Sequence, residues 1–372
     1  MSAFTHLGVK KEFVKSLKEL QITTPTEIQE KTIPLLLKSK KDFIGLAQTG
    51  TGKTAAFGLP ILHKVDANKP EVQALILSPT RELVQQIKKQ LFKFTKYSDN
   101  RIFLEAVFGG EKIDKQLKNL ERTTHIIVAT PGRLLDLIKR GAIDLSNVKT
   151  VVLDEADEML SMGFKKELDA ILTYTRTAKS TWLFSATMPE GIKRIIKTYM
   201  ASDAIQIAVN ANTIVNSNIS HQYIKTSLQQ KTADIMEYLT VKGQGRGIIF
   251  CKTKLGTQAL AKELLEDGFS VAALEGDMTQ KERDKVMRAF KNEMIQILVS
   301  TDVSARGIDV KDLEYVIHHQ LPDQLEYYTH RSGRTARAGQ KGKSVAFVLP
   351  VELERIFKLQ KALGIKFNEK QL

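Results

Sequence analysis

The strongest constraint on the fold of this chain is a repeated alternation of short apolar runs with longer stretches of helical periodicity. In the first half the apolar runs cover residues 42–46, 74–77, 125–128, 150–153 and 181–184. Between them, residues 82–94 and 133–139 carry apolar side chains at helical spacing. Strands that alternate with helices at this spacing predict a parallel sheet covered by helices.

The second half repeats this arrangement with apolar runs at residues 247–250, 270–274, 295–299, 315–318 and 344–348. Between the halves, residues 210–218 are polar and rich in asparagine, which is typical of a linker. A length of 372 residues suits two domains of ordinary size. We therefore expect two tandem α/β domains, at residues 1–207 and 219–372, joined by a linker at residues 208–218.

Charge points to a polyanionic partner, because lysine and arginine outnumber aspartate and glutamate by 56 to 42. The chain shows no signal-peptide pattern at its start and no apolar run of about 18 residues, so we expect no membrane association. The single cysteine, Cys251, excludes an internal disulfide and ends an apolar run, which predicts a small buried side chain. These features predict a cytoplasmic protein.

Polar clusters follow nearly every apolar run directly, at residues 48–54, 78–82, 130–133, 154–157, 185–187 and 300–309. In a parallel sheet the carboxyl ends of the strands meet at one edge, and ligands bind there. We expect these clusters to form the functional site.

The stretch AQTGTGKT matches a phosphate-binding loop from Gly52 onward, but Ala47 stands where the first glycine is expected. Lys53 would reach the β- and γ-phosphates and Thr54 would bind Mg²⁺, so both must open a helix. Gly50 and Gly52 provide the backbone freedom of such a loop. The methyl group of Ala47 is tolerable if its φ is negative. The alternative is a flexible loop that ends in GKT by accident.

Residues 151–155, VVLDE, read as a buried strand that delivers two neighbouring carboxylates. One of them can hold Mg²⁺ while the other orients or deprotonates water. The alternative is an acidic helix start, which the helix dipole favours. The phosphate loop upstream favours the catalytic interpretation.

Arg331, Arg334 and Arg337 recur at three-residue spacing in the half that lacks a phosphate loop. On a helix they would share roughly one face. Phosphoryl transfer needs cations at the γ-phosphate, so we interpret them as arginine fingers supplied by the second domain. A solvated basic patch and a simple nucleic-acid contact are the alternatives.

Together these motifs resemble those of the DEAD-box ATP-dependent RNA helicases, and residues 154–157 spell the name of that family. Nearly the whole chain follows the motif order of that family, at residues 25–29, 47–54, 79–83, 109–110, 130–133, 154–157, 185–187, 250–253, 280–283, 301–309 and 330–337. The resemblance implies two RecA-like domains, each a parallel sheet flanked by helices, and ATP hydrolysis stimulated by RNA.

The resemblance also implies residue roles, with ATP and Mg²⁺ as cofactors. The implied nucleotide-binding residues are Gln29, Gln48, Thr49, Gly50, Thr51, Gly52, Lys53, Thr54, Gly307 and Asp309. Asp154 would join Thr54 at Mg²⁺, and Glu155 would position the attacking water. Arg334 and Arg337 would contact the γ-phosphate. Hydrolysis would be coupled to the domain interface through Asp157, Ser185, Thr187 and His330.

RNA is the implied partner, held by its phosphates and 2′-hydroxyls rather than by its bases. The implied contacts are Pro79, Arg81, Gly109, Gly110, Thr130 and Arg133 in the first domain, and Thr253, Gly276, Gln280, Arg283 and Thr301 in the second. Taken alone, each threonine or glycine would be read as a turn or a cap. Backbone contacts predict little sequence preference and an affinity that falls steeply with salt.

The chain departs from the family pattern at several positions. Gln21 and Ile22 stand where the family usually has a glycine and an aromatic residue that stacks on adenine. Glu275 replaces a frequent histidine, Ser332 a frequent isoleucine or valine, and Ala336 a glycine. None of these changes removes a catalytic group.

The expected function is local unwinding of short RNA duplexes, or remodelling of ribonucleoprotein, by ATP-driven closure of two domains on one strand. Two alternatives remain, an RNA-dependent ATPase that clamps ribonucleoprotein without useful unwinding, and an RNA-binding pseudoenzyme that holds ATP as a structural ligand. Ribonucleoprotein and RNA-decay proteins are the candidate partners. No basic extension follows the second domain, which predicts either a minimal family member or a core without its extension.

Overall fold

The computed structural model divides the chain into two units, Met1–Ala211 and Asn212–Leu372. It describes residues 3–48, 50–175, 178, 180–209, 218–242, 245–305, 313–336 and 340–372. Most of the expected linker at residues 208–218 lies outside these ranges, so its bounds stay a prediction. Within the described ranges, no helix has the length and apolar character that crossing a membrane requires.

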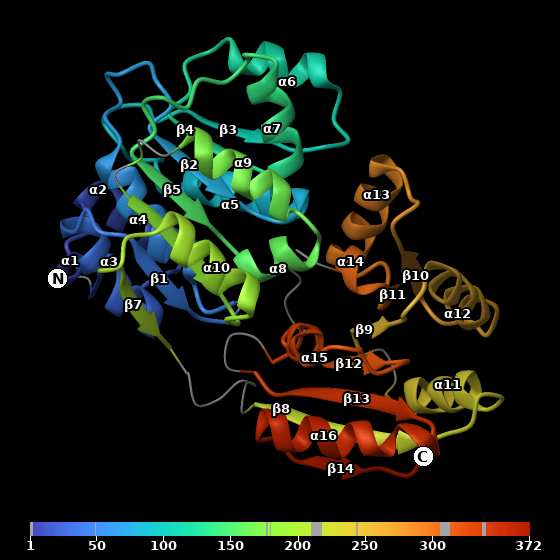
Figure 1. Cartoon of the computed structure of the whole chain (residues 1–372). Helices are drawn as coiled ribbons and strands as arrows, with labels where there is room; N and C mark the ends of the chain where they lie inside the picture. Colours follow the sequence, from blue (N-terminus) through green and yellow to red (C-terminus); the bar gives the residue numbers. More distant parts are fainter. Residues whose placement is uncertain are drawn as a thin grey trace. The chain divides into compact units, whose positions relative to one another are not determined.

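The first unit is built on one sheet, in which seven strands of the described residues lie in the order β3-β4-β2-β5-β6-β1-β7 (Figure 1). The strands are β1 (Phe43–Leu46), β2 (Ala74–Leu77), β3 (Leu104–Val107), β4 (Ile126–Ala129), β5 (Thr150–Leu153), β6 (Ser180–Ser185) and β7 (Ile205–Ala208). Every pair of neighbours in this sheet is parallel. The predicted parallel architecture is therefore confirmed for this half.

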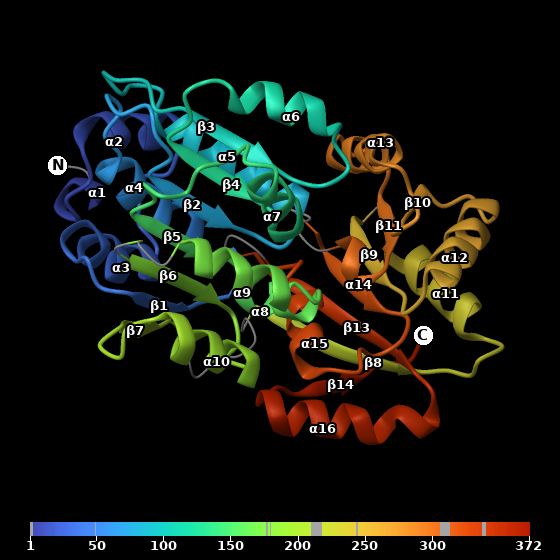
Figure 2. The same cartoon turned by 45° about the horizontal axis from the view of Figure 1, so that its top comes forward.

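Helices cover both faces of the first sheet (Figure 2). One face packs against α1 (Ala3–His6), α2 (Lys11–Glu19), α3 (Glu27–Lys38), α4 (Lys53–Lys64) and α5 (Arg81–Phe94). The other face packs against α6 (Ile113–Leu120), α7 (Pro131–Lys139), α8 (Ala156–Ser161), α9 (Lys165–Tyr174) and α10 (Glu190–Tyr199). Because both faces are buried, the inner strands carry continuous apolar runs rather than an alternating pattern.

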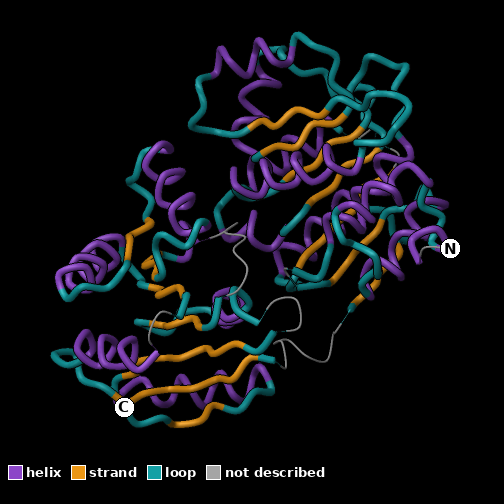
Figure 3. The backbone as a smooth tube through the Cα atoms, turned by 180° about the vertical axis from the view of Figure 1, so that it is seen from behind, coloured by secondary structure: helices purple, strands orange, loops and turns teal. Residues whose placement is uncertain are grey.

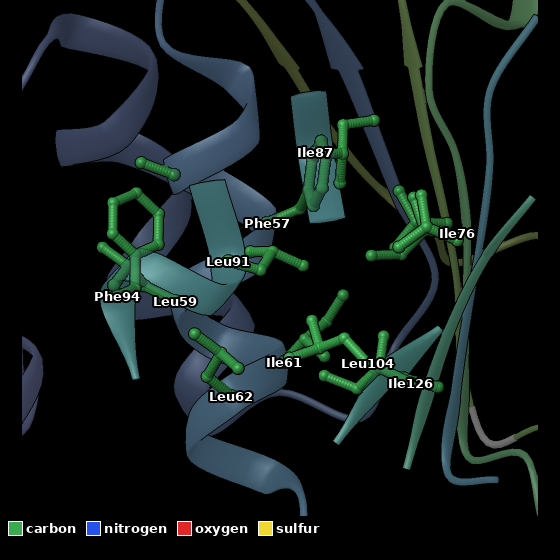
Figure 4. Close-up of a cluster of buried hydrophobic side chains, with 14 of the residues drawn as sticks. Phe57, Leu59, Ile61, Leu62, Ile76, Ile87, Leu91, Phe94, Leu104 and Ile126 are labelled. Carbon is green, nitrogen blue, oxygen red and sulfur yellow. The ribbon is translucent and has the colours of Figure 1, made fainter. Parts of the chain in front are cut away.

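The packing of α4 and α5 on the sheet depends on close contact between the two helices (Figure 4). Leu91 of α5 is fully buried, and a Cβ atom placed on Gly58 of α4 would lie 2.3 Å from its Cδ2. Only a residue without a side chain at position 58 leaves room for Leu91. Ile76 and Ile126 of the sheet lie in the same cluster, so α5 is held firmly behind β2 and β4.

The second unit, which holds the C-terminal end of the chain, again combines strands with helices (Figure 3). Seven strands of its described residues lie in the order β10-β11-β9-β12-β13-β8-β14. The strands are β8 (Ile219–Lys225), β9 (Gly247–Phe250), β10 (Val271–Leu274), β11 (Ile297–Ser300), β12 (Tyr315–His318), β13 (Gly342–Val348) and β14 (Phe367–Glu369). All its strand pairs are parallel. The predicted fold class is confirmed in both halves.

Two layers of helices cover the second sheet as well. One face packs against α11 (Lys231–Lys242) and α12 (Lys254–Glu266). The other packs against α13 (Gln280–Lys291), α14 (Asp302–Ala305), α15 (Leu325–Ser332) and α16 (Leu353–Leu363). A short 3₁₀ turn, Pro350–Glu352, precedes α16. Cys251 is buried beside this sheet, and burial raises the pKa of its thiol to about 12, which agrees with the predicted apolar role.

Four strands were absent from the sequence prediction, namely β3, β7, β8 and β14. Three of them, β3, β7 and β14, lie at the edges of their sheets, and β8 is next to an edge. Strands in these positions are less enclosed, so they tolerate polar residues such as Glu105, Gln206 and Gln222. The continuous apolar run that identifies an inner strand is therefore missing.

Leu91→Ala should destabilise the first unit by about 2–5 kcal/mol, because it leaves a cavity against Gly58 and the sheet. The single tryptophan, Trp182, is buried in the same unit, so its fluorescence during urea denaturation reports this loss. Phe92→Ala is the matched control, because Phe92 is the next residue on α5 and is 66% exposed. Equal denaturation midpoints for Leu91→Ala and the unaltered chain would contradict this packing.

Candidate functional site

The phosphate-loop sequence forms a tight connection between β1 and α4. Gly52 caps α4 with φ of 92° and Gly50 has φ of 81°, conformations that glycine adopts without strain. Ala47 is not among the described residues with positive φ, so its methyl group is accommodated as predicted. Lys53 opens α4 and is buried, and its Nζ donates to the carbonyl oxygen of Ala47 at 3.1 Å.

The structure describes two of the three threonines in the predicted loop. Thr51 donates its hydroxyl to the carbonyl oxygen of Gln48 at 2.8 Å, which closes the loop on itself. Thr54 is the second residue of α4 and is half-buried. Thr49 lies outside the described residues, as do Gly307, Asp309 and Arg337, so their predicted roles stay predictions.

The start of α3 holds the phosphate loop in place. Gln29 is buried, and its Nε2 donates to the carbonyl oxygen of Gly52 at 3.0 Å. Its Oε1 accepts from the backbone N–H of Thr26 at 3.0 Å, which caps the helix. The Thr26 hydroxyl donates to the Thr51 carbonyl oxygen at 2.7 Å. Sequence analysis missed this role of Thr26, although the threonine and glutamine at capping-box spacing are its visible signal.

Asp154 follows β5 at the same edge of the sheet and has an exposed fraction of only 4%. Burial raises the pKa of its carboxyl group to about 7, against the opposing effect of the nearby Lys53 ammonium. Its Oδ1 is buried and has no hydrogen-bond partner among the described residues. A buried carboxylate oxygen of this kind fits a hard divalent cation, which prefers oxygen ligands.

The same region offers few protein ligands for a metal. The described residues contain no group of three or more His, Cys, Asp or Glu side chains that could hold a metal ion. Mg²⁺ commonly binds through one or two protein oxygens together with substrate phosphates. The pairing predicted for Asp154 and Thr54 supplies oxygen ligands of the kind that Mg²⁺ uses together with substrate phosphates.

Glu155 sits in an unusual backbone conformation. It precedes α8 with φ of 52° and ψ of 51°, in the left-handed region that disfavours residues with a side chain. Its exposed fraction is 7%. Strained residues held in place by their surroundings cluster at functional sites, and this strain turns the chain sharply between β5 and α8. The alternative prediction of an acidic helix start also describes this segment, since Asp157 lies in the first turn of α8.

Asp157, Ser185 and Thr187, which were predicted to act together in coupling, form one hydrogen-bonded group. The Oδ2 of Asp157 accepts from the backbone N–H of Thr187 at 2.8 Å and from its hydroxyl at 2.7 Å. Ser185 donates its hydroxyl to the Thr187 carbonyl oxygen at 2.7 Å. The group ties the start of α8 to the segment after β6. This arrangement is compatible with the predicted coupling role, which stays a prediction.

The predicted RNA contacts of the first unit lie at the carboxyl ends of β2, β3 and β4, which are neighbours in the sheet. Pro79 follows β2 and Arg81 opens α5, while Gly109 and Gly110 follow β3, and Thr130 and Arg133 stand at the start of α7. Gly110 has φ of 78°, and a Cβ placed on it would lie 2.0 Å from Nη1 of Arg81. The guanidinium group therefore lies directly against the glycine.

Arg133 contacts the segment that directly follows Gly110. Its guanidinium nitrogens donate to the carbonyl oxygen of Glu111 at 3.2 Å and to Oε1 of Gln116 at 3.1 Å. Gln116 is buried and donates its Nε2 to the carbonyl oxygen of Phe108 at 2.8 Å. Gln116 is a positioning residue that sequence analysis missed, because one glutamine on an amphipathic helix carries no motif.

The predicted RNA contacts of the second unit follow its corresponding strands β9, β10 and β11. Thr253 caps α12 through the N–H of Gly256 at 3.0 Å, and Gln280 opens α13 and donates to Asp284 at 2.8 Å. Gly276 follows β10, and Thr301 follows β11. Arg283 donates to the carbonyl oxygen of Ser304 at 3.3 Å. The structure thus brings each unit's RNA candidates to one edge of its own sheet.

The arginine cluster does not form the predicted helical face. Helix α15 ends at Ser332, so Arg334 lies in the turn beyond it. Arg331 is buried, and its Nε and Nη2 donate to the two carboxylate oxygens of Asp302 at 2.5 Å and 2.7 Å. Arg331 is therefore a structural anchor. Arg334 has an exposed fraction of 8%, and its backbone N–H donates to the carbonyl oxygen of Arg331 at 3.0 Å.

A buried polar network surrounds this anchor. The Ser344 hydroxyl lies 2.9 Å from Nε2 of His318, 3.1 Å from the Tyr328 hydroxyl and 2.9 Å from the Ser332 hydroxyl. Tyr328 also lies 2.7 Å from Nδ1 of His221. The serine at position 332, a departure from the family, is thus matched by polar partners. His330 lies one residue before Arg331 on α15 and is half-buried.

Four other residues depart from the family pattern, and two of them have an unusual backbone conformation. Gln21 and Ala336, which replace glycines of the family pattern, have φ of 59° and 57°. Both keep the left-handed conformation that glycine adopts without strain, at a cost of about 1–2 kcal/mol each. Ile22 packs against the core beside α2. Glu275 is buried, and it accepts from the N–H of Asp277 at 2.6 Å.

Comparisons with known proteins identify relatives over the whole chain. Residues 26–195 match the family described as DEAD/DEAH box helicase, and residues 230–339 match the helicase conserved C-terminal domain. The ATP-dependent RNA helicase CshA of Limosilactobacillus reuteri is 41% identical over 98% of this chain and 72% of that protein. The DEAD-box ATP-dependent RNA helicase CshA of Geobacillus kaustophilus is 40% identical over 99% of this chain and 78% of that protein.

Solved structures are similar as well. Saccharomyces cerevisiae Dbp5 bound to RNA and ADP BeF3 is 30% identical, with a TM-score of 0.91 over 100% of this chain and 96% of that chain. A DEAD box protein from the hyperthermophile Methanococcus jannaschii is 38% identical, with a TM-score of 0.57 and coverage of 99% of both chains.

The buried histidines should make the second unit lose stability in acid. Burial lowers the pKa of His221 to about 4, and burial with the neighbouring Arg331 lowers that of His318 further below its usual value. Between about pH 6.5 and pH 4 the unfolded chain binds protons that the folded chain does not, so stability falls as the pH drops. At pH 5 the loss from His221 is about 2 kcal/mol.

Urea denaturation at pH 7.5 and pH 5, followed by circular dichroism, measures this loss. Trp182 is the only tryptophan and lies in the first unit, so its fluorescence follows the unfolding of that unit separately. His221→Gln removes the titrating group and should lose less stability between the two pH values than the unaltered chain. Equal losses in both proteins would show that folding does not lower the pKa of His221.

Proposed function

The chain belongs to the DEAD-box family of ATP-dependent RNA helicases, and we propose that ATP hydrolysis at the carboxyl edge of its first sheet drives unwinding of short RNA duplexes or remodelling of ribonucleoprotein. One observation carries the location of the chemistry. The buried carboxylate of Asp154, with an oxygen that lacks a partner among the described residues, is close enough to Lys53 for that ammonium to lower its pKa. Phosphoryl transfer needs a cation at the phosphates and a carboxylate that can hold Mg²⁺ or orient water.

Lys53 is the proposed phosphate ligand. Its ammonium would leave the carbonyl oxygen of Ala47 and bind the β- and γ-phosphates when ATP enters. Mg²⁺, held by the Thr54 hydroxyl and by Asp154, would neutralise charge on the phosphates. Glu155 would position the attacking water, and its burial supports this role because the surrounding groups limit the orientations of the carboxylate.

Gln29 is the proposed adenine reader. An amide side chain has two N–H donors and two acceptor lone pairs. Among the described residues, one donor binds Gly52 and one acceptor binds Thr26. One donor and one lone pair therefore remain, which match the N7 acceptor and the N6 donor of adenine. The same side chain would connect base recognition to the phosphate loop through Gly52.

The second domain would complete the reaction by supplying positive charge. We expect closure of the two domains, with ATP and RNA bound, to bring Arg334 to the γ-phosphate, with Arg337 beside it. The bidentate contact of Arg331 with Asp302 supports this role for Arg334, because it holds the preceding turn rigid. A strand gripped and bent by both domains cannot stay paired, and hydrolysis would then release it.

Glu155→Gln should abolish the ATP hydrolysis that single-stranded RNA stimulates at low salt, because the amide cannot activate water. Phosphate release with and without RNA measures the effect. Glu190→Gln on α10, where the side chain is 68% exposed, should hydrolyse ATP like the unaltered chain. Absence of hydrolysis in the unaltered chain would favour an RNA-binding module. If the unaltered chain does hydrolyse ATP, a strand-displacement assay distinguishes a helicase, which separates the duplex, from a clamp, which does not.

Arg334→Ala should lower turnover by roughly 10³ to 10⁵, the usual loss when an arginine finger is removed. Its affinity for ATP, measured with a fluorescent nucleotide, should change much less, because the binding loop belongs to the first unit. Arg355→Ala is the control, since Arg355 lies in the same unit and is 38% exposed. Full turnover in Arg334→Ala would disprove its assignment as the finger.

A further inference from the structure

Two exposed phenylalanines mark a hollow on the first unit, away from the phosphate loop. Phe92, near the end of α5, is 66% exposed, and Phe103, just before the edge strand β3, is 45% exposed. They border a hollow of about 810 Å³ beside the end of α2, whose lining includes Leu20, Phe92, Thr95, Arg101, Ile102 and Phe103. Large apolar side chains gathered in an open hollow indicate a binding surface.

The charges that line this hollow, and those on the adjoining turn of α5, are mostly positive. Lys96 pairs with Glu19, and Lys88 pairs with Glu105. Lys89, Lys93 and Arg101 have no ion-pair partner within the described ranges. The surface thus combines exposed aromatic rings with cations that are available to an anionic ligand.

Phe92 connects this hollow to a second one that lies toward the proposed RNA path of this unit. A second hollow, of about 340 Å³, is lined by Gln85, Lys88, Lys89, Phe92, Phe108 and Glu111 among others. Phe92 borders both hollows, and Glu111 follows Gly110 directly. Arg81 opens the same helix, so α5 leads from the Arg81–Gly110 contact to Phe92 over about 16 Å. In Figure 1, α5 and β3 lie beside each other along this route.

We propose that the end of α5, with residues 95–103, is an accessory binding site for single-stranded RNA that leaves the Arg81–Gly110 contact. Phe92 stacks on a base, and Lys89, Lys93 and Arg101 contact phosphates. Aromatic rings interleaved with cations are the usual means of binding a single strand without sequence preference. The inference rests on the proposed RNA path through Arg81. It adds that the bound strand extends beyond this contact to the end of α5.

An acidic peptide with apolar anchors is the competing occupant. The second hollow favours RNA, because it is lined by both Phe92 and Glu111, so that a strand bound at the Arg81–Gly110 contact could extend along α5 to Phe92. The two occupants also need different properties of Phe92. A base needs a flat ring on which to stack, whereas an apolar anchor of a peptide needs only apolar area.

Binding of fluorescein-labelled oligouridylates of about 6 and about 15 nucleotides, in the presence of a non-hydrolysable ATP analogue, tests the proposal. Phe92→Ala should weaken binding of the long strand by about tenfold and leave that of the short strand unchanged. Phe92→Trp should retain the affinity, and Phe92→Leu should lose it as the alanine variant does. Phe357→Ala, at a 58% exposed phenylalanine on α16, is the matched control.

Each outcome separates the accessory site from the function on which it rests. Unchanged binding of the long strand by Phe92→Ala, or full affinity in Phe92→Leu, would overturn the accessory RNA site. A short strand that fails to bind the unaltered chain, or that binds Arg81→Ala equally well, would overturn the proposed RNA path instead. A charge reversal, Lys93→Glu, should lower the affinity for the long strand and flatten its salt dependence.

Discussion

The parallel direction of every strand in each sheet is the constraint on which the rest of this structure depends. A parallel sheet needs crossover helices, and these bury both of its faces. Polar side chains are thereby excluded from the strands and concentrated in the loops that follow them. Because all strands point the same way, the loops after β1, β2, β4 and β5 meet at one edge. Lys53 and Asp154, far apart in the sequence, become neighbours for this reason.

The two sheets have corresponding strand orders, yet their matching loops have different chemistry. β1 and β8 occupy the same place, and each is followed by a helix that begins with a lysine, Lys53 or Lys231. The loop before Lys231 has no glycine. Lys231 is buried, and its ammonium donates to the carbonyl oxygens of His319 and Phe347 at 3.0 Å. Within the described part of the second unit, this lysine therefore ties strand ends together instead of offering a phosphate site.

The departures from the family pattern show how a fold absorbs unusual residues. At Gln21 and Ala336 the backbone keeps the left-handed conformation although a side chain has been added, so the surrounding structure outweighs the local cost. At Ser332 the added hydroxyl is buried, and Ser344 lies within hydrogen-bond distance of it. A buried hydroxyl without a partner would cost about 1–3 kcal/mol, so the serine depends on that neighbour.

The sequence by itself determined the parallel two-unit architecture, the inner strands and the start of a helix at Lys53 after β1, because these are recorded in local periodicity and motif spacing. It missed edge strands such as β3, whose partial exposure permits polar residues. It also misjudged Arg331, because nothing in the sequence indicates that Asp302 is in contact with it. Gln116 and the hollow at Phe92 were decided by tertiary structure alone, whereas the capping box of Thr26 was visible in the sequence and only its hydrogen bond to Thr51 was not. Each depends on segments distant in the chain, and only the folded arrangement sets which groups are buried and which partners they meet.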